Sequence, residues 1–415
     1  MKAIVFTLGC KVNEVESAKI MSALENAGFE VCDKLGVADV YVLNTCAVTA
    51  EAEKKSRQLV ARAKKFNPQA SVYVCGCASQ KNAPAFEEKG VKFVCGTADR
   101  YAVVDQICAD FNAPCVSAQL AYPKLTKTRA FIKIGDGCNN FCSYCIIPHL
   151  RGRVNSRKAD DVVAEIKACE AQEIVLTAIN LSAYNDGEND LTELIKKLKF
   201  CDKRIRLGSL ECRVITPEFL SALKELVDFA PQFHLSLQSG SDAVLKSMNR
   251  RYTSQEFLEK CALIYDYFPD GAITTDIIVG FPTETDDDFE KSVQIIKKAN
   301  FSRVHAFAFS PREGTPAYKM KDLAKATKSA RLHTLMATAT DVEKAYISAR
   351  KGKTYSVILE DFDGQYTGGY TPNYIRVYVM GNHCGQQKNV ILGEPFKDGA
   401  LGYIDGESTY SAIAE

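Results

Sequence analysis

Residues 131–145 read FIKIGDGCNNFCSYC, an apolar β-strand followed by a loop with three cysteines. Cys138, Cys142 and Cys145 have the spacing C-x3-C-x2-C. Three thiolates this close can hold three irons of a [4Fe–4S] cluster and leave the fourth iron open to a small molecule. Zinc is the alternative, with the nearby His149 as a fourth ligand. The segment therefore predicts a metal centre in a loop directly after a strand.

Strand and helix patterns alternate downstream of this loop. Short apolar runs are separated by stretches with helical periodicity, and the pattern contains six strand–helix units. Such a series predicts a parallel barrel or partial barrel, whose chemistry gathers at the carboxyl ends of the strands. The expected strands are 131–134, 174–177, 204–207, 233–237, 272–278 and 304–309.

In the N-terminal part of the chain, strand and helix patterns alternate in a second, shorter series. Apolar strands at 3–6, 40–43 and 72–74 are separated by helical stretches at 14–27 and 51–66. This βαβαβ order predicts a parallel sheet covered by helices.

A second group of cysteines follows the strands of this N-terminal sheet. Cys10, Cys46 and Cys77 each come a few residues after a predicted strand. Because the carboxyl ends of parallel strands lie side by side, the three thiols can converge into a second cluster site with an open iron. Each could instead be a small buried residue. Cys75 competes with Cys77, which we prefer because it lies in the loop after Gly76.

The tail of the chain changes character from Lys353 onward. Runs of β-branched and aromatic residues alternate with glycine turns, which predicts a small all-β domain of about five strands. Residues 116–128 have no sustained pattern and are expected to be a linker. We therefore expect three domains, at residues 1–115, 128–350 and 351–415.

Composition excludes several classes of protein. The chain has 415 residues, of which 46% are hydrophobic and 25% charged, so it is neither disordered nor fibrous. A net charge of +1 excludes a globally basic nucleic-acid binder. The start, MKAIVFTLGC, is typical of a first strand and not of a signal peptide, and there is no apolar run long enough to cross a membrane. We expect a cytoplasmic protein whose 16 cysteines are reduced.

The motifs taken together resemble the methylthiotransferase family of radical S-adenosylmethionine (SAM) enzymes, over essentially the whole chain. The tail resembles a TRAM domain, the RNA-binding β-barrel that ends these enzymes. The motifs that carry the family resemblance are Gly9-Cys10 with Asn13, Asn44-Thr45-Cys46, Gly76-Cys77, the cysteine triplet followed by Ile146-Ile147-Pro148 and Arg151-Gly152, Gln238-Ser239-Gly240-Ser241, and Gly280-Phe281-Pro282-Thr283-Glu284.

The resemblance implies a fold of three parts and two clusters. The parts are an N-terminal flavodoxin-like parallel sheet, a central partial (β/α)6 radical SAM barrel and a small C-terminal TRAM barrel. The cluster on Cys138, Cys142 and Cys145 would cleave SAM to a radical that removes hydrogen from C2 of an adenine. The cluster on Cys10, Cys46 and Cys77 would hold or supply the sulfur. No side chain of ordinary pKa can deprotonate such a C–H bond, so acid–base catalysis is not an adequate alternative.

Residues at predicted strand ends are the candidates for SAM binding. The aromatic residue before the third cysteine of the triplet lies against the adenine in the family. The glycine of the Gly280 motif either contacts SAM through its backbone or only forms a tight turn. The strand motif expected as L-T-G-x-N has Ala178 in place of glycine. The candidates are Tyr144, Thr177, Asn180, Glu211, Ser236, Gln238, Gly280 and Pro282.

Within the family, the chain is most similar to the branch that acts on N6-threonylcarbamoyladenosine, 3′ of the tRNA anticodon. Residues 46–49, 55–58 and 369–374 point to that branch. The reaction would use two SAM molecules, a sulfur donor of unknown identity and an electron donor such as a flavodoxin. The alternatives are the same reaction on N6-isopentenyladenosine, methylthiolation of a ribosomal protein, and a non-catalytic RNA-binding protein with structural zinc.

Charge predicts where RNA would bind. Between Lys124 and Asp161 there are eight basic residues and three acids, so Arg151 and Arg153 are expected to attract phosphates next to the cluster loop. The tail from Lys353 has four basic residues and eight acids. It would bind RNA through an aromatic surface, or serve only as a structural cap. The aromatic candidates are Tyr366, Tyr370 and Tyr374.

Overall fold

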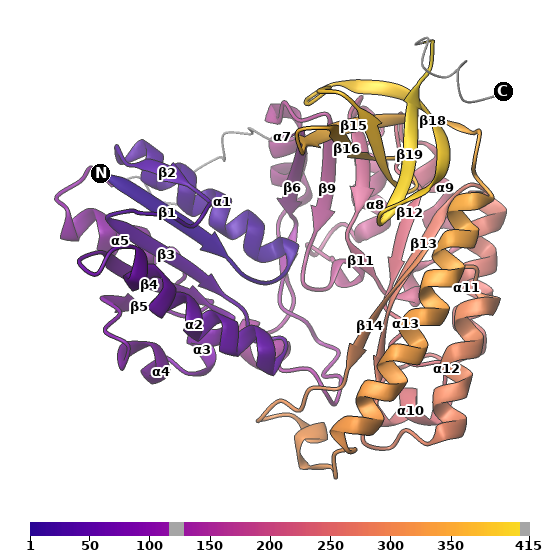
Figure 1. Cartoon of the computed structure of the whole chain (residues 1–415), viewed down its shortest axis with the longest axis horizontal. Helices are drawn as coiled ribbons and strands as arrows, with labels where there is room; N and C mark the ends of the chain where they lie inside the picture. Colours follow the sequence, from indigo (N-terminus) through magenta and orange to yellow (C-terminus); the bar gives the residue numbers. More distant parts are fainter. Residues whose placement is uncertain (116–127, 407–415) are drawn as a thin grey trace. The chain divides into compact units, whose positions relative to one another are not determined.

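The computed structural model describes residues 1–115 and 128–406 (Figure 1). The chain divides into two compact units: one comprises residues 1–124, 135–155 and 310–320, and the other comprises the remaining residues. Most of the predicted linker, with Lys124 and Lys127, lies outside the described residues. Among the residues that are described, no helix is long and apolar enough to cross a membrane.

The first unit is built on a five-stranded parallel sheet with the order β2-β1-β3-β4-β5. This order is that of flavodoxin-like proteins, which confirms the predicted fold. The two edge strands were not predicted, because runs of three and two residues carry no periodicity. The strands are β1 (Lys2–Thr7), β2 (Glu30–Cys32), β3 (Val40–Thr45), β4 (Ser71–Gly76) and β5 (Phe93–Val94).

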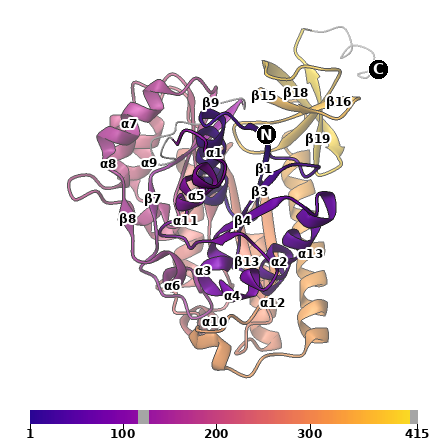
Figure 2. The ribbon, with the colours of Figure 1, turned by 90° about the vertical axis from the view of Figure 1, so that its left-hand side faces the viewer.

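Helices cover both faces of this sheet (Figure 2). Apolar side chains of α1 and α5 pack in one core against one face, and those of α2 pack in a second core against the other. Each face is buried because the strands alternate their apolar side chains between the two cores. The helices are α1 (Lys11–Asn26), α2 (Ala50–Phe66), α3 (Cys77–Lys81), α4 (Pro84–Glu87) and α5 (Ala102–Asp110).

The segment with the three-cysteine loop belongs to the first unit. Ile147 and Leu150 pack against the core on the α2 side of the sheet. The backbone N–H of Ala317 donates to the carbonyl oxygen of Ser143 at 2.8 Å, which ties in the third segment of the unit. The elements of these segments are β7 (Gly135–Asp136), α6 (Ile147–Arg151) and the 3-10 turn η3 (Pro316–Lys319), and β8 (Asn155–Ser156) lies where the unit ends.

The second unit contains the predicted series of parallel strands. They form two sheets, β6-β9-β10 and β11-β12-β13-β14, and Gly208 connects β10 directly to β11. Each predicted strand is found within two residues of its expected position. The strands are β6 (Arg129–Lys133), β9 (Glu173–Thr177), β10 (Arg204–Leu207), β11 (Ser209–Leu210), β12 (Gln232–Leu235), β13 (Ala272–Val279) and β14 (Arg303–Ala308).

Helices cover one face of these strands and leave the other face polar. Apolar side chains such as Ile174, Leu207 and Ile277 pack in the core under the helices, while residues next to them in sequence, such as Arg206 and Asp276, point to the opposite, concave face. The helices are α7 (Ala159–Ala168), α8 (Leu191–Lys197), α9 (Pro217–Lys224), α10 (Asp242–Ser247), α11 (Ser254–Tyr267), α12 (Asp286–Lys298) and α13 (Lys325–Ser348), with 3-10 turns η1 (Leu181–Ala183) and η2 (Cys212–Val214).

The tail forms a closed five-stranded barrel with the order β15-β16-β17-β19-β18, as predicted (Figure 1, yellow). Val357, Val377, Val379 and Val390 fill its core. Gly402 has no room for a side chain, since a Cβ there would lie 2.3 Å from the Val377 side chain. The strands are β15 (Thr354–Phe362), β16 (Tyr366–Tyr370), β17 (Arg376–Met380), β18 (Gln387–Phe396) and β19 (Gly399–Ile404).

Candidate functional site: two sets of three cysteines

Three cysteines stand at the carboxyl ends of three neighbouring strands of the flavodoxin-like sheet. Cys10 follows β1 and precedes α1, Cys46 follows β3, and Cys77 begins α3 directly after β4. Cys10 is exposed, whereas Cys46 and Cys77 are buried. We call these residues the strand-end cysteines.

Two glycines allow the strand-end loops to approach one another. Gly9 has a φ of +118°, and a Cβ there would lie 3.2 Å from the Cys46 Sγ. Gly76 has a φ of +104°, and a Cβ there would lie 2.6 Å from both the Asn44 Oδ1 and the Thr45 carbonyl oxygen. Both positions need glycine for conformation and for space. The sequence motifs Gly9-Cys10 and Gly76-Cys77 thus have a direct structural reason.

Asn13 and Arg151 join the three strand-end loops. Asn13 Nδ2 donates to the carbonyl oxygens of Leu8, at 2.7 Å, and Thr45, at 3.2 Å. Arg151 Nη2 donates to Asn13 Oδ1 at 2.6 Å, and Arg151 Nε donates to the Cys77 Sγ at 3.3 Å. The loops before Cys10 and Cys46 are therefore tied to the thiol of Cys77 through two side chains.

Arg151 is the centre of a buried ion network. Its side chain has no exposed surface and pairs with Glu16 at 3.0 Å and with Asp136 at 3.1 Å. Arg100 pairs with the same two acids. Burial lowers the pKa of Arg151, but the charges of Glu16, Cys77 and Asp136 outweigh this and hold its pKa above the usual value.

This network corrects the expectation that Arg151 attracts RNA phosphates. A guanidinium without exposed surface, with two carboxylates beside it, has no access to a phosphate. Arg153 is exposed, and its guanidinium lies 4.4 Å from the centre of the Phe141 ring. Glu16 and Arg100 were not singled out by sequence reasoning. The signal that could have revealed Glu16 is a charged residue on the buried face of a helix, since Val15 and Ile20 are buried on the same helix.

The buried strand-end thiols are weak acids in the metal-free protein. The pKa of Cys46 is raised to about 11, chiefly by burial; the neighbouring Cys77 and Cys10 also raise it, while a hydrogen bond with the Val48 backbone and the charge of Arg151 lower it. Burial also raises the pKa of Cys77, against the opposing effect of Arg151. Metal binding must therefore displace thiol protons. Cys75 is fully buried in the α1–α5 core, on the strand β4 itself.

The second set, Cys138, Cys142 and Cys145, lies in one loop, which we call the cluster loop. The N–H of Cys138 donates to the carbonyl oxygen of Gly152 at 3.1 Å, and the N–H of Cys145 donates to the carbonyl oxygen of Cys142 at 2.9 Å. Gly137, with a φ of +71°, passes so close to the backbone after α6 that a Cβ would lie 2.0 Å from the Arg153 carbonyl oxygen.

Both sets have the ligand chemistry that an iron–sulfur cluster with an open iron needs. Each offers three soft thiol ligands, and the tight glycines bring the loops together without filling the space with side chains. The ring of His149, the alternative fourth ligand for zinc at the cluster loop, packs edge-on against Phe141 with ring centres 5.8 Å apart.

Seven of the eight SAM candidates gather at one edge of the second unit. Thr177 is the last residue of β9, and the others follow β9, β11, β12 and β13 at their carboxyl ends. The eighth candidate, Tyr144, lies in the cluster loop of the first unit. The seven are Thr177, Asn180, Glu211, Ser236, Gln238, Gly280 and Pro282.

Arg250 links two of these candidates. Its guanidinium lies 3.4 Å from the Glu211 carboxylate and donates to the Ser236 carbonyl oxygen at 3.2 Å. Tyr252 OH donates to the same carbonyl at 2.6 Å. Gln238 has a φ of +73°, an uncommon conformation for a residue with a side chain.

The Gly280 motif has a clear packing role. Gly280 has a φ of +71°, and a Cβ there would lie 2.3 Å from the Lys328 side chain. Its N–H donates to the Glu284 carboxylate at 3.1 Å, and Arg331 pairs with that carboxylate at 2.7 Å. The tight turn is thus present, and a contact with SAM at Gly280 or Pro282 stays a prediction.

The aromatic residues of the tail take part in packing within the second unit. The rings of Tyr370 and Tyr374 are stacked with centres 4.6 Å apart. The guanidinium of Arg129 lies 5.2 Å from the Tyr370 ring, and that of Arg206 lies 4.9 Å from the Tyr374 ring. These two rings therefore contact β6 and β10. Tyr366 packs against Phe396 within the tail barrel, with tilted rings whose centres are 5.4 Å apart.

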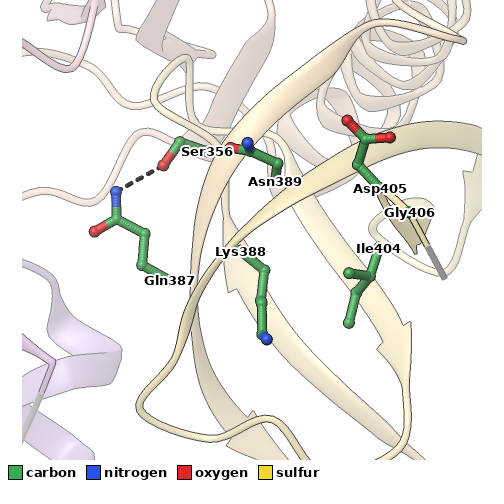
Figure 3. Close-up of a pocket in the computed structure, with 7 residues that line it drawn as sticks. All are labelled: Ser356, Gln387, Lys388, Asn389, Ile404, Asp405 and Gly406. Carbon is green, nitrogen blue, oxygen red and sulfur yellow. Dashed lines mark hydrogen bonds between the residues drawn. The ribbon is translucent and has the colours of Figure 1, made fainter.

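A pocket of about 560 Å³ lies on the tail barrel, and none of the predicted site residues lines it (Figure 3). Its lining is mostly polar and includes Lys388, Asn389 and Asp405. Gln387 Nε2 donates to Ser356 Oγ at 2.6 Å at its rim.

A series of parallel βα units, with a three-cysteine loop after its first strand and a second three-cysteine set in the N-terminal part of the chain, is typical of an enzyme of the radical SAM class. Sequence comparison agrees. The profile of the Radical SAM superfamily matches residues 132–296, and that of "Uncharacterized protein family UPF0004" matches residues 2–96. Among solved structures, the radical SAM methyltransferase TsrM from Kitasatospora setae has a similar fold. It has a TM-score of 0.54 and 13% identity, and the match covers 76% of this chain and 77% of that one.

Relatives of known name are similar over almost the whole chain. The threonylcarbamoyladenosine tRNA methylthiotransferase MtaB of Bacillus subtilis is 36% identical, over 95% of this chain and 94% of its own. MtaB of Thermotoga maritima is 35% identical, over 95% of each chain. The tRNA-2-methylthio-N(6)-dimethylallyladenosine synthase of Thermodesulfovibrio yellowstonii is 32% identical, over 96% of this chain and 97% of its own.

The chain belongs to the tRNA methylthiotransferase family of radical SAM enzymes. It is a transferase that uses SAM and carries two [4Fe–4S] clusters.

Proposed function

We propose that this enzyme methylthiolates C2 of N6-threonylcarbamoyladenosine, at the position 3′ of the tRNA anticodon, with two SAM molecules and a sulfur donor. The observation that carries the proposal is the similarity to the MtaB relatives, at 36% and 35% identity over 95% of the chain. The second candidate is the same reaction on N6-isopentenyladenosine, because a relative named for dimethylallyladenosine is 32% identical over a similar length.

We assign the two clusters to the two cysteine sets. Cys138, Cys142 and Cys145 would hold the cluster that binds SAM, and Cys10, Cys46 and Cys77 would hold the second. When bound, the first cluster supplies the electron that cleaves SAM and the second holds the sulfur that is transferred. The support is geometric: each set offers three thiols in closely packed backbone with glycines at the tight positions.

The chain's own residues would position these groups. Arg151 fixes the Cys77 thiol by an N–H···S bond, and Asn13 holds the loops before Cys10 and Cys46. Thr177, Asn180, Glu211, Ser236, Gln238, Gly280 and Pro282 would bind SAM from the strand ends, with Tyr144 from the cluster loop. Arg250 would orient the Glu211 carboxylate through its ion pair.

The partners of the reaction are part of the same proposal. They are tRNA, an electron donor such as a flavodoxin, and a sulfur donor, all in the cytoplasm. The exposed Arg153 would contact phosphates near the cluster loop.

The substrate is tested with the reconstituted enzyme and three matched tRNAs. These carry threonylcarbamoyladenosine, isopentenyladenosine or unmodified adenosine at the same position, and digested nucleosides are analysed by mass spectrometry. We expect the methylthio product only from the first tRNA. Product from the isopentenyl tRNA alone would select the second candidate. A ribosomal protein substrate would leave all three tRNAs unchanged.

A further inference from the structure

Three potential metal ligands, none of them a cysteine, converge on the concave face of the second unit. His234, Asp276 and His305 lie on the neighbouring parallel strands β12, β13 and β14. His234 is in register with Thr274, and Asp276 is in register with His305. Residues next to them in sequence pack in the core under the helices, so these three side chains point to the opposite face.

The three side chains are close enough to share one ion. His234 Nε2 lies 3.3 Å from Asp276 Oδ2, and the rings of His234 and His305 have centres 5.9 Å apart. One ligand atom from each residue lies within 4.8 Å of the other two. His234 and Asp276 are half-buried and His305 is exposed, so an ion can enter from solvent.

His234 is held in the orientation that a ligand needs. Its Nδ1 lies 3.0 Å from the Thr274 hydroxyl, which also accepts a hydrogen bond from Gln232 Nε2 at 2.9 Å. With an ion bound, Nδ1–H can donate to this hydroxyl oxygen and Nε2 faces the ion, in place of its present hydrogen bond to Asp276 Oδ2. A hydrogen bond at the second ring nitrogen is what supports most metal-binding histidines.

We propose that His234, Asp276 and His305 bind one divalent transition-metal ion of the Mn²⁺, Fe²⁺ or Zn²⁺ type. Two imidazoles and one carboxylate are ligands that these ions accept, and the site contains no thiol, unlike the cluster sites. Three protein ligands leave coordination positions open toward the concave face. The site can therefore take oxygen atoms of a further ligand as well as the ion.

The test measures Mn²⁺ binding to the full-length enzyme, with both clusters loaded and oxidised. Mn²⁺ is chosen because it prefers nitrogen and oxygen ligands, so the sixteen cysteines compete little. Free Mn²⁺ has a six-line EPR signal that decreases on binding. We expect one ion per chain, with ¹⁴N couplings from imidazole in pulsed EPR.

Variants locate the ion. Asp276→Asn and His305→Ala should each weaken Mn²⁺ binding by about tenfold or more. His333→Ala, which removes an exposed imidazole from α13, should not change it. The proposal is overturned if wild-type enzyme binds no Mn²⁺ at about 1 mM, or if the bound ion shows no ¹⁴N coupling. Equal binding by all variants would also overturn it. The ¹⁴N couplings of Mn²⁺ bound to the wild-type enzyme test for imidazole ligands even where a variant does not fold.

Discussion

The strand-end cysteines and the cluster loop are two solutions to the same problem, which is to hold three thiols around an open site. The cluster loop solves it locally, within eight residues, with Gly137 pressed against the backbone at Arg153. The strand-end set needs the whole sheet, because Cys10 and Cys77 are brought together by β1, β3 and β4. A local motif tolerates changes elsewhere in the fold, whereas a convergent one depends on the contacts between its loops.

Arg151 joins the Cys77 thiol to Asp136, just before the cluster loop, so its loss should have the largest effect. Arg151→Ala would leave the buried carboxylate of Glu16 and the partly buried one of Asp136 without one of their cations, at a cost of about 3–5 kcal/mol in the free energy of unfolding. Chemical denaturation of Arg151→Ala measures the loss in the free energy of unfolding, and Arg153→Ala, at an exposed position, is the control. Equal stability of the two variants would show that the network does not hold the sets together.

Gly76→Ala should damage the strand-end set and spare the cluster loop. The new Cβ would collide with the Thr45 carbonyl oxygen and Asn44, and we expect loss of about half the iron. Gly28→Ala is the matched control, since Gly28 has a similar φ of +88° with nothing within 4 Å of a Cβ. Iron analysis and thermal melting compare the two. If Gly28→Ala loses as much iron, backbone conformation and not the close approach is responsible.

Cys75 is a core residue and Cys77 is a proposed cluster ligand, although they are only two positions apart in the sequence. Cys75→Ser should keep all iron but lose about 1–3 kcal/mol of stability, because it buries a hydroxyl in the α1–α5 core. Cys77→Ser should lose the strand-end cluster. Iron content of the two purified variants is the measurement, and the reverse result would move the site by two residues.

The smallest effect is expected from the exposed charge beside the cluster loop. Arg153→Ala should leave iron content unchanged and reduce the slope of log binding constant against log salt for tRNA by about one. Binding curves at several salt concentrations measure this slope. An unchanged slope would mean that Arg153 serves only its contact with Phe141.

Sequence reasoning was most successful where the signal is periodic or closely spaced. The strands of both α/β parts, the five-stranded tail and the cysteine spacing follow from such patterns. The edge strands β2 and β5 are too short to show a period. The role of Arg151 was missed because counting charges along the chain does not reveal a partner 135 residues away, Glu16.

Separation along the sequence also explains why the proposed metal site on the concave face of the second unit could not be predicted from the sequence. His234, Asp276 and His305 lie on three strands that are far apart in the sequence, and only the register of β12, β13 and β14 brings them together. Convergence of the strand-end cysteines could be predicted because each follows a strand at a similar distance. Their supporting residues, such as Glu16 and Arg100, have no comparable spacing.

The most direct test of two separate cluster sites compares Cys46→Ala with Cys142→Ala in one experiment. Iron content and 5′-deoxyadenosine formation are measured on the anaerobically purified variants with SAM and a reductant. Each variant should lose about half the iron, and only Cys142→Ala should lose SAM cleavage, since the sets are built independently. Cys46→Ala should cleave SAM but form no methylthio product. Full iron and full product in Cys46→Ala would contradict the assignment of the strand-end cysteines.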